Sequence, residues 1–153
     1  MTTTIGYAGG VYDLFHIGHL NLLKHARSQC DYLIAGVVSD DLVEVTKGKR
    51  PVIPLAERVE IVSSIKFVDE ARPEVHLDKM DTWREVGFHV YFKGDDWKGT
   101  PQGITLKRRL AEVGVEVIYF PYSLQTSSSL LRRALDAFND QPGAAGASSF
   151  GTA

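Results

Sequence analysis

This chain has little cysteine and a small net charge. It has 153 residues, a single cysteine and a formal net charge of −2. One cysteine excludes an intrachain disulfide and favours a reducing compartment, and we expect Cys30 to be a small buried hydrophobe. The near-neutral charge argues against nucleic-acid binding, because a surface that holds a polyanion needs an excess of Lys and Arg. A local cationic pocket is still possible.

Long apolar runs are also absent. No stretch approaches the roughly 20 apolar residues that a membrane-spanning helix needs, so no membrane association is expected. Residues 1–4 lack the basic start and apolar core of a signal peptide, which predicts a cytoplasmic protein. The hydrophobic fraction of 44% and the length are typical of one soluble domain with a substantial core.

Short apolar runs alternate with amphipathic segments along most of the chain. Strands are predicted at residues 5–8, 31–38, 68–71, 90–92 and 115–120, and helices at 18–28, 39–45, 55–66, 81–86, 105–112 and 127–138. This alternation predicts an α/β fold, a single Rossmann-like domain over residues 1–138 whose parallel sheet carries helices on both faces. Residues 139–153 are rich in Gly, Ala and Ser, which predicts a flexible tail.

The most informative segment is 9–19, Gly-Gly-Val-Tyr-Asp-Leu-Phe-His-Ile-Gly-His. It places His16 and His19 at the junction of the first predicted strand and the first predicted helix. Gly9 and Gly10 allow close backbone approach to a ligand, and the helix N-terminus favours anions. Such junctions bind phosphates in open parallel sheets. A zinc site is the competing interpretation, but the other histidines and Cys30 are scattered, so no metal ligands are assigned.

Segment 9–19 resembles the His-x-Gly-His signature of the nucleotidyltransferase superfamily. Its lead-in Val11-Tyr12-Asp13 is similar to the cytidylyltransferase branch, which acts on glycerol 3-phosphate, ethanolamine phosphate or choline phosphate, and the small bacterial glycerol-3-phosphate enzyme is nearest in size. The resemblance covers roughly residues 5–135. It implies transfer of CMP from CTP to a phosphorylated alcohol, giving a CDP-alcohol and pyrophosphate, with Mg²⁺ carried by CTP. It also implies a homodimer, whose interface Tyr12, Phe15 and Ile17 could help to line.

The resemblance also implies roles for particular residues. Catalytic roles fall to His16, His19, Lys47 and Lys49; nucleotide binding falls to Gly9, Gly10, Val11, Asp13, Asp95, Asp96, Trp97, Thr126, Ser127 and Ser128; substrate binding falls to Arg58 and Lys66. Lys66 stands where the family often has arginine. Taken alone, the lysines could belong to a solvated loop, residues 95–97 to a turn, and 126–129 to a run of helix N-cap residues.

Two other functions stay open, and a departure from the family keeps the non-catalytic one of them open. Tyr122 occupies a position where the glycerol-3-phosphate enzyme has an arginine. The same scaffold could serve an adenylyltransferase that uses ATP on another phosphorylated acceptor such as FMN. It could also serve a non-catalytic nucleotide-binding protein, because the loss of an arginine removes positive charge from a phosphate site.

Overall fold

A computed structural model describes residues 2–121 and 127–140 of the chain. Five strands form one parallel sheet in the order β3-β2-β1-β4-β5. The strands are β1 (Ile5–Gly10), β2 (Tyr32–Val38), β3 (Glu70–Glu74), β4 (Val90–Gly94) and β5 (Glu116–Phe120). The predicted α/β class, with a single parallel-sheet domain, is confirmed.

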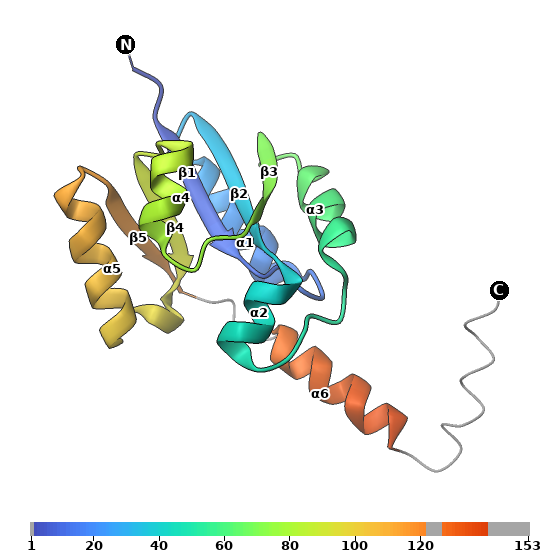
Figure 1. Cartoon of the computed structure of the whole chain (residues 1–153). Coiled ribbons are helices and arrows are strands. Elements are labelled where there is room, and N and C mark those ends of the chain that lie inside the picture. The colour runs from blue at the N-terminus through green and yellow to red at the C-terminus, as the bar shows by residue number, and fades with distance from the viewer. Residues whose placement is uncertain (1, 122–126, 141–153) are drawn as a thin grey trace.

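Helices cover both faces of the sheet (Figure 1). They are α1 (Ile17–Arg27), α2 (Asp40–Lys47), α3 (Leu55–Ser63), α4 (Lys79–Val86), α5 (Pro101–Glu112) and α6 (Ser128–Asn139), with a short 3₁₀ helix η1 (Asp95–Trp97). Leu23 of α1 and Val62 of α3 belong to the core on one face. Met80 of α4 and Leu110 of α5 belong to the core on the other face. Helix α6 extends away from the body of the sheet.

Several element boundaries differ from prediction by a few residues, and three of these differences have a clear physical reason. Strand β3 runs on to Glu74 and includes Pro73, which is tolerated because β3 is an edge strand. Helix α5 begins at Pro101, four residues earlier than predicted, because Thr100 caps it and proline suits the first turn. Helix α2 continues through Lys47, so this lysine ends a helix rather than lying in a loop.

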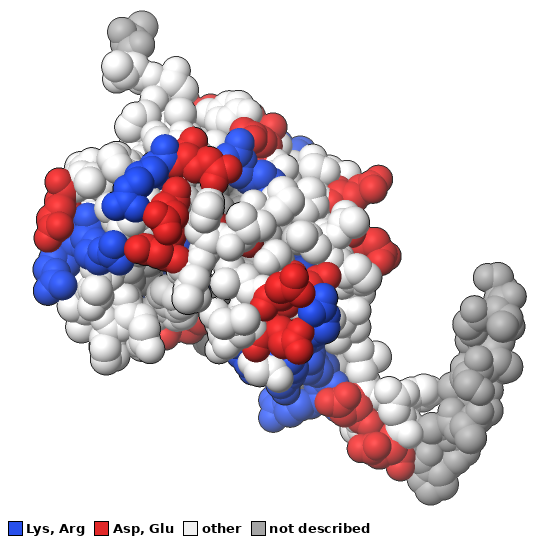
Figure 2. Space-filling view, viewed as in Figure 1, with Lys and Arg blue, Asp and Glu red and all other residues white. Residues whose placement is uncertain are grey.

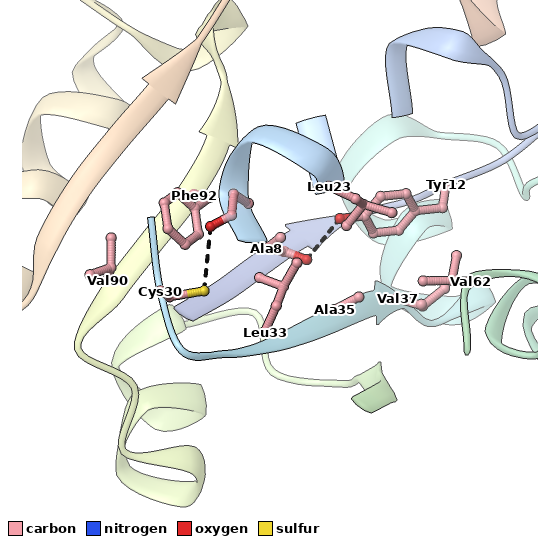
Figure 3. Packing of buried hydrophobic residues seen from close by; sticks show 11 residues of the cluster. Ala8, Tyr12, Leu23, Cys30, Leu33, Ala35, Val37, Val62, Val90 and Phe92 are labelled. Carbon is pink, nitrogen blue, oxygen red and sulfur yellow. Dashed lines mark hydrogen bonds between the residues drawn. The ribbon is translucent and has the colours of Figure 1, made fainter. Parts of the chain in front are cut away.

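The core between the sheet and helices α1 and α3 is drawn in Figure 3. Cys30 lies at its edge with 9% of its surface exposed, and its thiol donates a hydrogen bond to the Ala26 carbonyl at 3.3 Å. Burial raises the pKa of this thiol. The prediction of a small buried hydrophobe is therefore confirmed.

The order of the strands determines where a ligand can bind. The chain passes from β1 through β2 to β3 on one side, then returns to place β4 and β5 on the other side of β1. In such sheets the crevice at the carboxyl ends of the two strands where the order reverses is the usual ligand site. Here those ends are Gly9-Gly10 of β1 and Lys93-Gly94 of β4.

Two further observations concern the surface and the chain ends. On the face shown in Figure 2, basic and acidic side chains stand in small mixed groups rather than in one continuous basic surface. Within residues 2–121 and 127–140, no helix has both the length and the apolar character needed to cross a bilayer. Helix α6 takes in Asn139, the first residue of the predicted tail, and residues 141–153 lie outside the described part of the chain.

Candidate active site

The two signature histidines form a reciprocal cap at the start of α1. The His16 Nδ1 atom accepts a hydrogen bond from the Gly18 amide at 3.0 Å, and the His19 Nδ1 atom accepts one from the His16 amide at 3.2 Å. This is the geometry of a capping box, with imidazoles in place of the usual hydroxyl and carboxylate. Because both Nδ1 atoms accept hydrogen bonds from backbone amides, each neutral ring carries its own proton on Nε2.

The surroundings of this pair keep it neutral. Burial, with a smaller contribution from His16, lowers the pKa of His19 to about 3. Burial also lowers the pKa of His16. The two ring centroids are 4.0 Å apart, and Tyr12 lies edge-on to His19 at 5.4 Å. The start of α1 therefore presents two neutral Nε2–H donors, which can stabilise charge that develops on phosphate oxygens.

The depressed pKa of His19 predicts a pH-dependent stability. An unfolded histidine takes up a proton near pH 6.5, whereas the folded His19 does so only near pH 3, so the unfolded state binds more protons between these values. Acidification below pH 6.5 should therefore lower the free energy of unfolding, by at most about 1.4 kcal/mol per pH unit from this group. Urea unfolding between pH 7 and pH 4.5 measures the slope.

The control for this experiment is a pair of variants. His19→Asn should flatten the pH dependence, while His25→Asn, at an exposed position on the same helix, should keep the wild-type slope. An unchanged slope in His19→Asn would show that His19 does not stay neutral in the folded state.

The turn that leads into the histidines has an unusual backbone. Tyr12 and Leu14 have positive φ angles of 56° and 49°, which non-glycine residues adopt at a cost that the surrounding structure must offset. Tyr12 is held by a hydrogen bond from its hydroxyl to the Ala8 carbonyl at 2.9 Å. Tyr12 is buried within the chain and Ile17 is exposed, and the predicted dimer interface stays a prediction.

The glycines at the end of β1 have packing neighbours. A Cβ atom on Gly9 would lie 2.8 Å from the Tyr91 hydroxyl, and one on Gly10 would lie 3.2 Å from the Tyr12 ring. Both positions are therefore restricted by neighbouring aromatic rings, which the sequence could not show. Their predicted role in close approach to a nucleotide stays a prediction.

Asp13 is a positioning residue rather than a free nucleotide ligand. Its carboxylate accepts hydrogen bonds from the amides of Val52 and Ile53 at 2.8 and 2.9 Å, and the Arg132 guanidinium lies 3.3 Å away. The Ser128 hydroxyl donates to the Asp13 carbonyl at 2.5 Å. Asp13 thus ties the loop before α3 and the start of α6 to the turn that carries the histidines. Its predicted part in nucleotide binding stays a prediction.

Arg58 is also placed differently from the prediction. Its side chain is 0% exposed and forms an ion pair of 2.6 Å with Asp40. Its guanidinium also donates to the carbonyls of Val11, Val38 and Ile53 at 2.7, 2.8 and 2.8 Å. Every guanidinium nitrogen is used by the protein, and the predicted role of Arg58 in substrate binding stays a prediction. Because Arg58 donates to the Val11 carbonyl, it also holds the backbone of Val11 in place.

The remaining lysines divide between the two edges of the sheet. Lys47 and Lys49 follow β2 on the side of the histidines, and both are exposed. Lys66 lies between the end of α3 and the start of β3, at the opposite edge, because β3 runs parallel to β2 and β1. Lys66 is therefore not brought together with the histidines, and its predicted role in substrate binding stays a prediction.

The segment after β4 lies at the same edge as the histidines. Asp95 and Asp96 are exposed on η1, and the ring of Trp97 lies 4.2 Å from the Lys93 ammonium. Ser127 is the N-cap of α6, where its hydroxyl accepts from the Leu130 amide at 3.0 Å. The capping interpretation of Ser127 is thus confirmed, and its phosphate role stays a prediction. Thr126 and Tyr122 lie outside the described residues.

Two lysines that were not predicted as site residues face this edge. Burial, with smaller contributions from the charges of Lys47 and Lys79, lowers the pKa of Lys93 to about 8, although the charge of Asp96 acts in the opposite direction. Burial also lowers the pKa of Lys79, the first residue of α4. The signal in the sequence is a charged residue near the end of the otherwise apolar strand β4.

Known protein families share the sequence features that build this site. The cytidylyltransferase-like family model matches residues 7–134, which include most of β1, both histidines and the first half of α6. This chain belongs to the cytidylyltransferase-like family. It is a nucleotidyltransferase of that family, and its fold agrees with that of a solved relative, a lipopolysaccharide core biosynthesis protein from Thermoplasma volcanium. That structure is 28% identical, with a TM-score of 0.67 over 80% of this chain and 98% of that one.

Sequence relatives within the family differ in their named activities. A FAD synthase from Pyrococcus horikoshii is 33% identical over 142 residues, 86% of this chain and 93% of the relative. An ethanolamine-phosphate cytidylyltransferase from Arabidopsis thaliana is 47% identical over 104 residues, 63% of this chain and 24% of the relative. The family resemblance is confirmed, whereas the narrower likeness to the glycerol-3-phosphate enzyme is not what these relatives indicate.

Proposed function

We propose that this protein transfers AMP from ATP to a phosphorylated acceptor and releases pyrophosphate. An oxygen of the acceptor phosphate attacks the α-phosphorus in line, and the bond between the α-phosphorus and the bridging oxygen of the β-phosphate breaks. No covalent intermediate with the protein is needed, so the protein contributes position and charge stabilisation. The observation that carries this proposal is the pair of neutral Nε2–H donors at the start of α1.

The choice of ATP is supported by the FAD synthases, which this chain matches over nearly their whole length. An acceptor such as FMN would fit this activity. Cytidylyl transfer from CTP to a phosphorylated alcohol is the second candidate. It is favoured by the Val11-Tyr12-Asp13 lead-in and by the 47% identity to an ethanolamine-phosphate cytidylyltransferase.

Magnesium would enter with the nucleotide. Across residues 2–121 and 127–140, no group of three His, Cys, Asp or Glu side chains could hold a metal ion. The carboxylate of Asp13 already accepts two backbone hydrogen bonds. These residues do not form a protein site for Mg²⁺, so the ion would rely on triphosphate oxygens and water. The homodimer stays a prediction from the family.

A two-way assay tests the proposed function. ATP and CTP are each combined with Mg²⁺ and with FMN, glycerol 3-phosphate or a sugar phosphate, and pyrophosphate release is followed by a coupled assay. We expect release with ATP and at least one acceptor, at a kcat/KM at least about tenfold above that with CTP. A reversed preference would establish the cytidylyl alternative. Nucleotide binding without release from any pair would establish a non-catalytic binding protein.

A further inference from the structure

Helix α6 has an apolar face that the rest of the described chain leaves uncovered. Its apolar side chains stand at the three- and four-residue spacing that places them on one side of a helix: Leu131, Ala134, Leu135 and Phe138. Leu135 is 44% exposed and Phe138 is 56% exposed. Among the α-helices in the part of the chain that the structure describes, α6 alone has no buried residue.

The hydrogen bonds that join α6 to the body are polar contacts near its N-terminal end. The Ser128 hydroxyl donates to the Asp13 carbonyl at 2.5 Å. The Arg132 guanidinium lies 3.3 Å from the Asp13 carboxylate and 3.1 Å from the Arg50 carbonyl. From there the helix extends away from the sheet (Figure 1), and no described helix or strand packs extensively against it. Because a helix of about 12 residues is marginal in water without packing of its apolar face, we expect a partner to cover this face.

The charges along α6 are arranged so that two copies can pair in opposite directions. Arg132 and Arg133 lie in the half nearer the body, whereas Asp136 lies beyond them and Asp140 is the C-cap (Figure 2). Arg133, Asp136 and Asp140 form no ion pair with other described residues. An antiparallel pair places the basic half of one helix beside the acidic end of the other, whereas a parallel pair places like charges together. The helix dipoles favour the antiparallel direction as well.

A neighbouring apolar residue extends the surface that α6 offers. Two helices of this length bury less than the roughly 1,000 Å² of a stable interface, so a contact between helices alone would be weak. Val52 is 44% exposed, and its amide donates to Asp13, which also holds the first turn of α6. In an antiparallel pair the far end of one α6 lies beside this first turn of the other. The far end of each helix therefore meets the partner subunit near an exposed apolar side chain.

We propose that the apolar face of α6 docks against the same face of a second copy of this chain, in an antiparallel pair whose two-fold axis passes near Ala134 and Leu135. This arrangement brings Leu131 of one copy beside Phe138 of the partner subunit. A second copy fits this face because the helix is complementary to itself in both charge and apolar pattern. The surface differs from segment 12–17, where the family resemblance placed the dimer contacts. The inference does not depend on nucleotidyl transfer, because its readout is the oligomeric state.

The oligomeric state of the full chain tests this proposal. Sedimentation equilibrium is measured at protein concentrations from about 1 to about 200 μM. We expect a monomer–dimer equilibrium with a dissociation constant of about 1 to 50 μM, because the contact is small. A monomer at every concentration would overturn the proposal, and would leave segment 141–153 or an unrelated protein as the occupant of this face.

Variants connect the dimer to the apolar face of α6. Leu135→Glu and Phe138→Glu bring a charge into the contact and should each weaken the dimer by about tenfold or more. Ile104→Glu is the matched control, because Ile104 is an apolar residue of α5 that is 59% exposed. It should leave the dissociation constant within about twofold. A dimer of unchanged affinity in both α6 variants, with folding verified by urea unfolding, would show that the chain associates through another surface and would refute the proposal.

Cross-linking tests the direction of the helix pair. Two chains carry Cys30→Ala, which removes the single natural thiol, together with either Leu131→Cys or Phe138→Cys. A disulfide needs Cα atoms within about 7 Å, so a mixture of the two chains should form the 131–138 cross-link under mild oxidation. Neither chain by itself should cross-link at a comparable rate. Efficient cross-linking of the Leu131→Cys chain to itself would indicate a parallel pair and contradict the antiparallel arrangement.

Discussion

His16→Asn is expected to abolish most of the nucleotidyl-transfer activity while leaving the fold intact. The Asn side-chain oxygen can replace Nδ1 as the acceptor for the Gly18 amide, so the cap of α1 survives. The donor at Nε2 is lost, and removal of one donor to a developing anion costs about 10²- to 10³-fold in kcat. Steady-state kinetics with the preferred nucleotide and acceptor measure this loss.

A second substitution of His16 separates its role in capping α1 from its role in catalysis. In His16→Gln the longer side chain can carry an N–H to the position of Nε2, but the acceptor at Nδ1 is lost. It should retain more activity than His16→Asn and unfold more easily. His25→Asn, on the exposed side of α1, is the control and should change neither quantity. Full activity in His16→Asn would show that the Nε2 donor takes no part in the reaction.

Arg58→Met should produce the largest loss of stability in this chain. Arg58 is buried and donates to three carbonyls and to Asp40, so methionine leaves these acceptors without a donor. Breaking a buried, hydrogen-bonded ion pair by removing one partner costs about 3–5 kcal/mol of unfolding free energy. Arg58→Lys should recover only part of this, because an ammonium cannot reproduce the planar fork of a guanidinium. Urea unfolding monitored by circular dichroism gives the values.

An exposed arginine provides the comparison. Arg84 pairs with Asp81 on the surface of α4, and Arg84→Met should cost no more than about 1 kcal/mol. If Arg58→Met instead kept wild-type stability and raised only the KM for substrate, then Arg58 would contact the substrate directly. That outcome would reverse the positioning role derived from its buried contacts.

Local chemistry explains why much of the fold was predictable. The central residues of each strand and helix could be predicted from the spacing of apolar residues. The polar residues Ser39, Asp78 and Ser127 cap helices near the predicted boundaries. The ends of β3 and α5 were harder to predict because they depend on the sheet edge and on the packing of Gly103 against the Trp97 carbonyl. A Cβ at Gly103 would lie 1.9 Å from that oxygen.

Some of the site residues could likewise be placed from the sequence, whereas others could not. The positions of His16 and His19 follow from their three-residue spacing after a strand, because a helix start brings residues three apart onto one side. Arg58 and Lys66 could not be separated by sequence, since each is a basic residue in or beside the same predicted helix. The fold buries Arg58 beneath the turn that carries the histidines and leaves Lys66 at the opposite edge of the sheet.

The sequence by itself determined the alternating α/β order, the strand-to-helix junction that carries the two histidines at 9–19 and the family, because each depends on residues that are neighbours along the chain. Only the tertiary structure decided which charges are free. The Asp13 carboxylate accepts hydrogen bonds from residues 52–53, and the Arg58 guanidinium donates to the Val11 carbonyl. In each case the two partners are about 40 residues or more apart in the sequence. The sequence shows which side chains are charged, but which of them form ion pairs or hydrogen bonds depends on distances that only the folded structure determines.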